Sequence, residues 1–261
     1  MTSTALSESL QGRRALVTRG TKRAAAAAAR RLARAGADVL VTARSHHPDE
    51  AETFIAAGLS TGQGAGHAVA EVHTRPGGAG IPVHALGGTG TPVGGFAAPG
   101  EEYGPRHSAP ARRPQYVPDR GPLPGTTTAD KGATVHATSI HHRMPLRNGT
   151  PAHAAAKATP ATHGKGPADE TAPHCVRVNT VSPGLTRTTT ADHPAGRTSQ
   201  ETDNTRQAAP NRLTDPPAGI PLNRPRRPAD VTEPVAFPVP DHASAVTDAG
   251  HVIDSGTTPT R

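Results

Sequence analysis

Residues 13–42 constrain the fold of this chain more than any other segment. The apolar run "RRALVT" predicts a buried strand, and the alanine-rich run from Lys22 to Ala35 predicts a helix that stops at Gly36. The run "ADVLVTAR" then predicts a second strand. Strand, helix and strand within about thirty residues indicate a βαβ unit with parallel strands and a right-handed crossover.

Further strands are predicted along the rest of the chain, at 81–86, 133–139, 176–182 and 249–256. Prolines weaken the helical pattern between them, because an interior proline removes a hydrogen bond and clashes with the preceding turn. The alternation still predicts an α/β fold, a Rossmann-type doubly wound parallel sheet with proline-disrupted helices. We expect a single domain over 10–261, with 185–230 as a flexible loop region.

The composition restricts the classes of protein that the chain can belong to. It has 28 glycines, 28 prolines, no tryptophan, two tyrosines and three phenylalanines, so few large side chains are available for a core. A chain largely unable to fold therefore stays one alternative. The single Cys175 excludes an internal disulfide and a cysteine-rich zinc module. No apolar run approaches the length of a membrane helix, and we expect a soluble, cytoplasmic protein with no membrane partner.

The charge of +7 raises the question of nucleic acid, but the basic residues are scattered in pairs and aromatic stacking platforms are nearly absent. We expect no specific nucleic-acid partner. The 15 histidines lack the spacing and carboxylate partners of a zinc site, so no metal site is predicted. A serine-hydrolase site is disfavoured because no G-x-S-x-G turn surrounds Ser139.

Seven short runs, in order along the chain, resemble the short-chain dehydrogenases/reductases. They are "ALVTRGTKRAAA", "VTAR", "VHALGG", "VHATSI", "HAAAK", "VRVNTVSPG" and "VIDSGT". The resemblance spans about 240 residues and implies a Rossmann-type sheet, a nicotinamide cofactor and hydride transfer between an alcohol and a carbonyl. Members of this family usually pair as dimers or tetramers, so it also implies a homo-oligomer.

The resemblance implies a cofactor site at the first turn, where the family has three glycines in T-G-x-x-x-G-x-G. Here Arg19, Arg23 and Ala25 stand at those positions. Arg44 follows the second strand, where a basic residue suits the 2′-phosphate of NADP and an acidic one the ribose of NAD. NADP is therefore the expected cofactor, with NAD as the alternative. The cofactor contacts that the resemblance implies are Thr18, Gly20, Thr21, Lys22, Arg44, Gly87, Lys157, Pro183, Gly184 and Thr188.

The family's proton relay is a serine followed by Tyr-x-x-x-Lys. Ser139 matches the serine and Lys157 matches the lysine, while His153 stands in place of the tyrosine. In the family the serine orients the substrate oxygen, the tyrosine exchanges the proton, and the lysine lowers the pKa of the tyrosine. Imidazole is a common general acid or base, but its nitrogen lies closer to the backbone than a phenol oxygen does.

The sequence thus predicts an NADP-dependent oxidoreductase of this type, acting on a small-molecule alcohol or carbonyl with impaired activity. Its predicted catalytic residues are Ser139, His153 and Lys157. The alternative is a catalytically inactive Rossmann-like protein that binds a nucleotide or a partner. The substrate is not readable from the sequence, because the substrate loop falls in 185–230.

Overall fold

The computed structural model describes residues 8–45, 53–75, 78–85, 131–145, 151–186, 220–224 and 226–259. The strands form a parallel sheet in the order β3-β2-β1-β4-β5-β6-β7. Their bounds are β1 Arg14–Thr18, β2 Asp38–Ala43, β3 Phe54–Ala56, β4 Ile81–His84, β5 Gly132–Ala137, β6 Val176–Pro183 and β7 Gly250–Ile253. The helices are α1 Arg23–Arg34, α2 Gly62–His73, α5 Pro151–His163, α6 Lys165–Thr171 and α9 Pro228–Ala236, with short 3₁₀ turns η2 Ile140–His142, η3 Ala172–His174 and η5 Asp241–Ala243.

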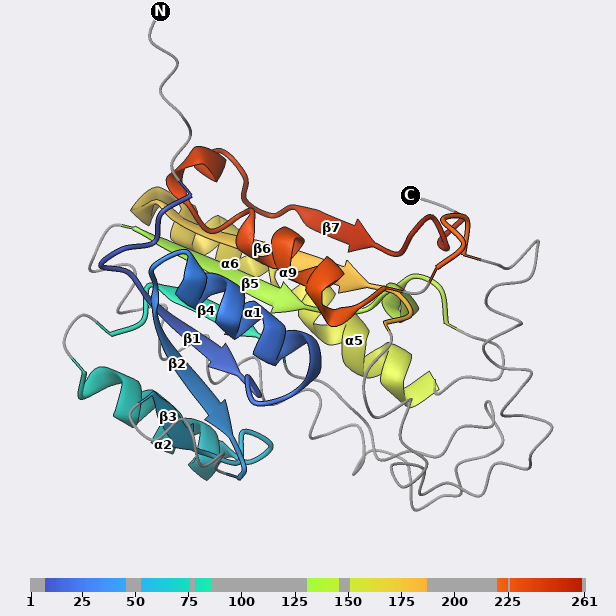
Figure 1. Ribbon diagram of the computed structural model, residues 1–261. Coiled ribbons are helices and arrows are strands. Elements are labelled where there is room, and N and C mark those ends of the chain that lie inside the picture. The colour runs from blue at the N-terminus through green and yellow to red at the C-terminus, as the bar shows by residue number, and fades with distance from the viewer. Residues whose placement is uncertain are drawn as a thin grey trace, which may run out of the picture.

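Helices cover both faces of this sheet (Figure 1), with α1 and α9 on one side and α5 and α6 on the other. Successive residues of a strand point to opposite faces. Ala15 and Val17 of β1 accordingly join the apolar cluster under α1 and α9, while Leu16 joins the cluster under α2. The predicted doubly wound Rossmann-type sheet is confirmed.

Helix α1 lies close to the bounds that the sequence predicts. Its buried residues recur at helical spacing along one face: Ala25, Ala26, Ala28, Ala29 and Leu32. The helix ends before Gly36, which adopts φ 96° and donates a backbone hydrogen bond to the Ala33 carbonyl. The small alanine side chains let the helix lie against the sheet and against α9.

Two prolines lie inside helices without ending them. Helix α5 continues through Pro160, and α9 continues through Pro234. The disruption that the sequence predicts therefore does not occur at these positions, because tertiary packing outweighs a local cost of about 3 kcal/mol per interior proline. Helix α9 also begins at Pro228, inside the predicted 185–230 loop, where a proline suits the first helical position. Residues 187–219 lie outside the described part of the chain.

The topology places a switch point at one edge of the sheet. Strand β1 lies between β2 and β4, so the chain crosses over in opposite directions on the two sides of β1. Ligands of open α/β sheets bind at the carboxyl ends of the strands at such a switch point. No helix among the described residues is long and apolar enough to span a bilayer.

Candidate functional site

The turn after β1 packs closely against the strands beneath it. A Cβ added at Gly20 would meet Val41 Cγ1 at 2.9 Å and the Val17 carbonyl oxygen at 3.1 Å, so a larger residue at this position would have to push against β1 and β2. Thr21 is partly buried, and Lys22 is exposed at the N-cap position of α1. The three residues thus lie in the turn between β1 and α1.

Thr18 is 1% exposed and faces the neighbouring strand. Its Oγ1 lies 3.4 Å from the Val83 carbonyl oxygen and accepts a hydrogen bond from the Ala85 backbone N–H at 3.0 Å. Thr18 thus joins β1 to the end of β4. These two hydrogen bonds align the end of β1 with the end of β4.

Two arginines in this turn stand where the resembled family has glycines, and both adopt the left-handed backbone conformation. Arg19 has φ 56° and Arg23 has φ 58°, a region that costs an L-residue roughly 1–2 kcal/mol. Partial desolvation lowers the pKa of Arg19, and the positive charges of Arg23 and Arg44 lower it further. The turn therefore concentrates positive charge at the carboxyl edge of the sheet.

Arg44 lies at the same edge, one residue beyond β2. Thr18 and Thr42 are neighbours in the register of β1 and β2, so the residues after each strand end lie side by side. Arg44 and Arg23 are exposed, and neither forms an ion pair with another residue in the described ranges. Unbalanced guanidinium groups of this kind suit a phosphate ligand.

The predicted relay residues lie together at the ends of β5 and α5. Ser139 begins the turn η2, and its Oγ accepts a hydrogen bond from the His141 backbone N–H at 3.3 Å. His153 and Lys157 lie one helical turn apart on α5. Lys157 is 8% exposed, and its Nζ donates to the Ala137 carbonyl oxygen at 3.2 Å. Ala137 precedes Ser139 by two residues, which brings α5 against the serine turn.

The two titratable relay residues have shifted pKa values. Burial, and then the charge of Arg19, lowers the pKa of Lys157 to about 8. Burial, followed by the charges of Lys157 and His141, lowers the pKa of His153 to about 4. At neutral pH the His153 ring is therefore uncharged. An uncharged imidazole accepts a proton at one nitrogen and carries a proton on the other.

His141 was not among the site residues predicted from the sequence. Its ring meets the His153 ring edge to face, with centroids 5.5 Å apart and planes 78° apart. Both rings are partly buried. The only sequence signal is its position two residues after Ser139, which by itself does not indicate a contact with α5.

Pro183 is the last residue of β6, and Gly184 follows it. The Gly184 backbone N–H donates to the Ile253 carbonyl at 2.9 Å, and a Cβ at Gly184 would collide with Arg226 Nη2. Arg226 is 2% exposed and donates to Ser255 Oγ at 2.8 Å and to the Leu185 carbonyl at 3.0 Å. Sequence reasoning missed this arginine. Two predicted contacts, Gly87 and Thr188, lie outside the described residues.

His84, the last residue of β4, is fully buried and stacks on His136 of β5, with ring centroids 5.3 Å apart. His136 also meets His163 of α5 edge to face at 6.2 Å. These imidazoles fill the space between the sheet and α5.

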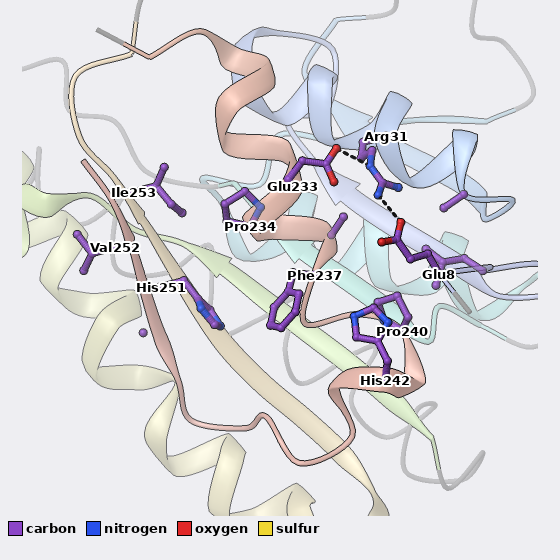
Figure 2. Close-up of a pocket in the computed structure, with 14 residues that line it drawn as sticks. Glu8, Arg31, Glu233, Pro234, Phe237, Pro240, His242, His251, Val252 and Ile253 are labelled. Carbon is purple, nitrogen blue, oxygen red and sulfur yellow. Dashed lines mark hydrogen bonds and ion pairs between the residues drawn. The ribbon is translucent and has the colours of Figure 1, made fainter. Parts of the chain in front are cut away.

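A cavity in the described part of the chain lies elsewhere, between α1, α9 and β7 (Figure 2). It measures about 630 Å³, and Phe237, His242 and His251 line it below the Glu8–Arg31–Glu233 ion pairs. None of the predicted site residues lines it. We therefore assign the site from the side chains at the carboxyl edge of the sheet and not from cavity size.

Comparisons with known proteins agree with this fold. Residues 123–258 match the sequence model of a family described as Enoyl-(Acyl carrier protein) reductase. Oxidoreductase UcpA of Escherichia coli is 32% identical over 136 residues, 52% of this chain and 49% of the relative. The chain thus spans about half the length of the curated relatives that it matches.

Solved structures match nearly the whole chain. A short chain dehydrogenase/reductase family protein is 26% identical with a TM-score of 0.77, covering 96% of this chain and 99% of its own. L-sorbose reductase from Gluconobacter frateurii, complexed with NADPH and L-sorbose, shares the fold at 21% identity, with a TM-score of 0.82 and coverage of 98% and 100%. A putative NAD(P)-dependent gluconate 5-dehydrogenase from Beutenbergia cavernae with bound NADP does so at 24% identity, with a TM-score of 0.81 and coverage of 97% and 100%.

The parallel sheet, its switch point and these matches define a Rossmann-type protein of the oxidoreductase class. The chain belongs to the short-chain dehydrogenase/reductase family.

Proposed function

We propose that the chain is an NADP(H)-dependent oxidoreductase that interconverts a small-molecule alcohol and a carbonyl. The observation that carries the proposal is the position of Lys157, which is buried, hydrogen-bonded to Ala137 and one helical turn from His153 beside Ser139. Side chains of these types at this spacing can orient a substrate oxygen and exchange its proton.

The cofactor assignment rests on charge. Lys22, Arg23 and Arg44 are exposed at the carboxyl edge of β1 and β2. These residues fit a ligand with a pyrophosphate and a 2′-phosphate, so NADP(H) suits the site better than NAD(H). When bound, a nicotinamide cofactor would accept or donate the hydride.

The roles of the chain's own residues follow from their chemistry. The Ser139 hydroxyl donates a hydrogen bond to the substrate oxygen and orients it. His153 accepts the alcohol proton on its unprotonated ring nitrogen. With a pKa of about 4, roughly one ring in a thousand is protonated at pH 7, so His153 is a poor proton donor. Burial, and then the charge of Lys157, keeps His153 uncharged by lowering its pKa, and Lys157 holds positive charge beside the site. We expect alcohol oxidation to proceed better than carbonyl reduction.

A tyrosine at position 153 tests the assignment. His153→Tyr restores a phenol oxygen farther from the backbone, and we expect NADPH-dependent reduction of small ketones to rise by about tenfold or more. His153→Phe is the matched control, because it keeps a ring and has no group that carries a proton. Equal turnover in the two variants would refute the proposed role of position 153.

The second candidate is a protein that binds a nucleotide without turning it over. The arginines at two glycine positions and the imidazole at position 153 favour it. Saturable NADPH binding with no turnover in either wild type or His153→Tyr would support this candidate. For either function we propose a cytoplasmic location, since a single cysteine suits a reducing compartment.

A further inference from the structure

His141 and His153 face each other across the site from two different elements. His141 lies on η2, the turn that begins at Ser139, and His153 lies on α5. Their rings meet edge to face at 5.5 Å between centroids. Because the Ser139 Oγ accepts the His141 backbone N–H, the same turn positions the serine and the second imidazole.

In the described part of the chain, no carboxylate pairs with the His141 ring or the His153 ring. Within the described ranges, neither ring forms an ion pair or a side-chain hydrogen bond. The charged group nearest along α5 is Lys157, and Arg19 acts on Lys157 from the turn after β1. On η2, the adjacent His142 ring contacts the Ser139 carbonyl instead. His141 is thus the titratable side chain in ring contact with His153.

We propose that His141 passes the proton between His153 and solvent during turnover, acting through His153 and not on the substrate. The inference rests on the proposed function. It assigns a role to a residue that has no counterpart in the serine, tyrosine and lysine relay that the sequence matches.

The step balances as an alcohol oxidation. The alcohol O–H bond breaks and its proton goes to the unprotonated nitrogen of His153. The proton on the other nitrogen of His153 moves to His141, and from His141 to water. The alcohol C–H bond gives its electron pair, as hydride, to an oxidised nicotinamide cofactor. The products are a carbonyl compound, the reduced cofactor and one proton in solvent.

The transfer starts from the contact between the two rings. Their centroids are 5.5 Å apart, and their planes are 78° apart. The transfer requires one imidazole to rotate about its side-chain bonds until a nitrogen of each ring comes within hydrogen-bond distance. His141 is only partly buried, so the same ring can reach water.

The test compares His141→Phe with His67→Phe. Phenylalanine keeps an aromatic ring against His153 and removes both nitrogens, while His67, exposed on α2, supplies a control histidine outside the relay. Oxidation of cyclohexanol and benzyl alcohol with NADP⁺ is followed by absorbance. We expect His141→Phe to lower kcat by about tenfold or more with little change in KM, and His67→Phe to stay within about twofold of wild type.

Chemical rescue separates proton transfer from a structural role. Added imidazole can replace a missing proton carrier, so it should restore a large part of the kcat of His141→Phe and leave wild type unchanged. A loss in His141→Phe that imidazole does not restore would overturn the inference, as would wild-type turnover in that variant. If wild type itself has no turnover, the proposed function fails, and the relay fails with it.

A readout without turnover tests the contact on which the relay depends. NMR titration of the histidine rings should show that His153→Phe changes the titration midpoint of His141, because the two rings are adjacent. Titration of His141 that is identical in wild type and His153→Phe would overturn the relay even in an active enzyme.

Discussion

The Nζ of Lys157 donates a hydrogen bond to the Ala137 carbonyl oxygen across 3.2 Å, which ties α5 to the end of β5. This contact draws the ammonium group out of water, and the side chain is 8% exposed. It therefore sets both the geometry of the relay and the electrostatic state of its lysine.

The buried lysine should give the protein an alkaline rise in stability. Burial, and then Arg19, lowers the Lys157 pKa from 10.5 to about 8 in the folded state. Between these values the unfolded chain binds more protons than the folded one, so the free energy of unfolding increases with pH. The gap corresponds to roughly 3 kcal/mol as an upper limit. Urea unfolding from pH 7 to 10.5 should show this rise in wild type and not in Lys157→Met. Parallel curves for the two proteins would contradict the burial of a charged lysine.

The arginines at glycine positions should cost stability. Replacing Arg19 or Arg23 by glycine relieves a positive φ, and we expect each change to stabilise the fold by about 1 kcal/mol. Thermal midpoints should rise by roughly 2–4 °C. Cys175→Gly is the matched control, since Cys175 has φ 55° far from the cationic turn and isolates backbone strain from charge. Arg19→Ala removes the charge alone. A lower midpoint for both glycine variants would show that the arginines contribute more than their strain costs.

Arg177 should be essential to the segment that leads from α9 to β7. Its guanidinium is buried and donates to the carbonyls of Pro238, Val239, Pro240 and Ala243. Arg177→Met removes four hydrogen bonds from this segment, and we expect a loss of roughly 3 kcal/mol of unfolding free energy. Arg177→Lys should recover less than half of it, because one ammonium cannot match the planar fork. Chemical denaturation measures both variants, and a loss below about 1 kcal/mol in Arg177→Met would refute the role.

Local pattern was sufficient to predict six of the seven described strands, and β3 was not predicted. The six are short runs of apolar and β-branched residues. Strands β1, β2 and β4–β6 lie within about two residues of their predicted bounds, while β7 ends at Ile253, three residues before its predicted end. Helix α2 was not foreseen, because glycines hide its helical character. A Cβ at Gly64 would collide with the Gly58 carbonyl, so close packing and not helix propensity selects glycine there. Pro160 similarly hides the helical character of α5 in the sequence, because an interior proline is unfavourable in a helix.

The candidate site was predictable only where residues lie close in sequence or match a motif. Ser139, His153 and Lys157 were found because their order and spacing match a known relay. His141 and Arg226 could not be found in this way. Their roles come from contacts with α5 and with the end of β6, and such contacts depend on how distant elements pack.

The central claim is that the positively charged turn after β1, which carries Arg19 and Arg23, forms a site for NADP(H) together with the relay residues. Thermal unfolding of the purified chain with NADPH, with NADH and with no ligand tests it most directly. A ligand that binds only the folded state stabilises it by about 2.7 kcal/mol at a hundred times its dissociation constant. We predict a cooperative transition whose midpoint rises by several degrees with NADPH and less with NADH, and Arg44→Ser should remove the difference. A transition that neither nucleotide moves would contradict the account.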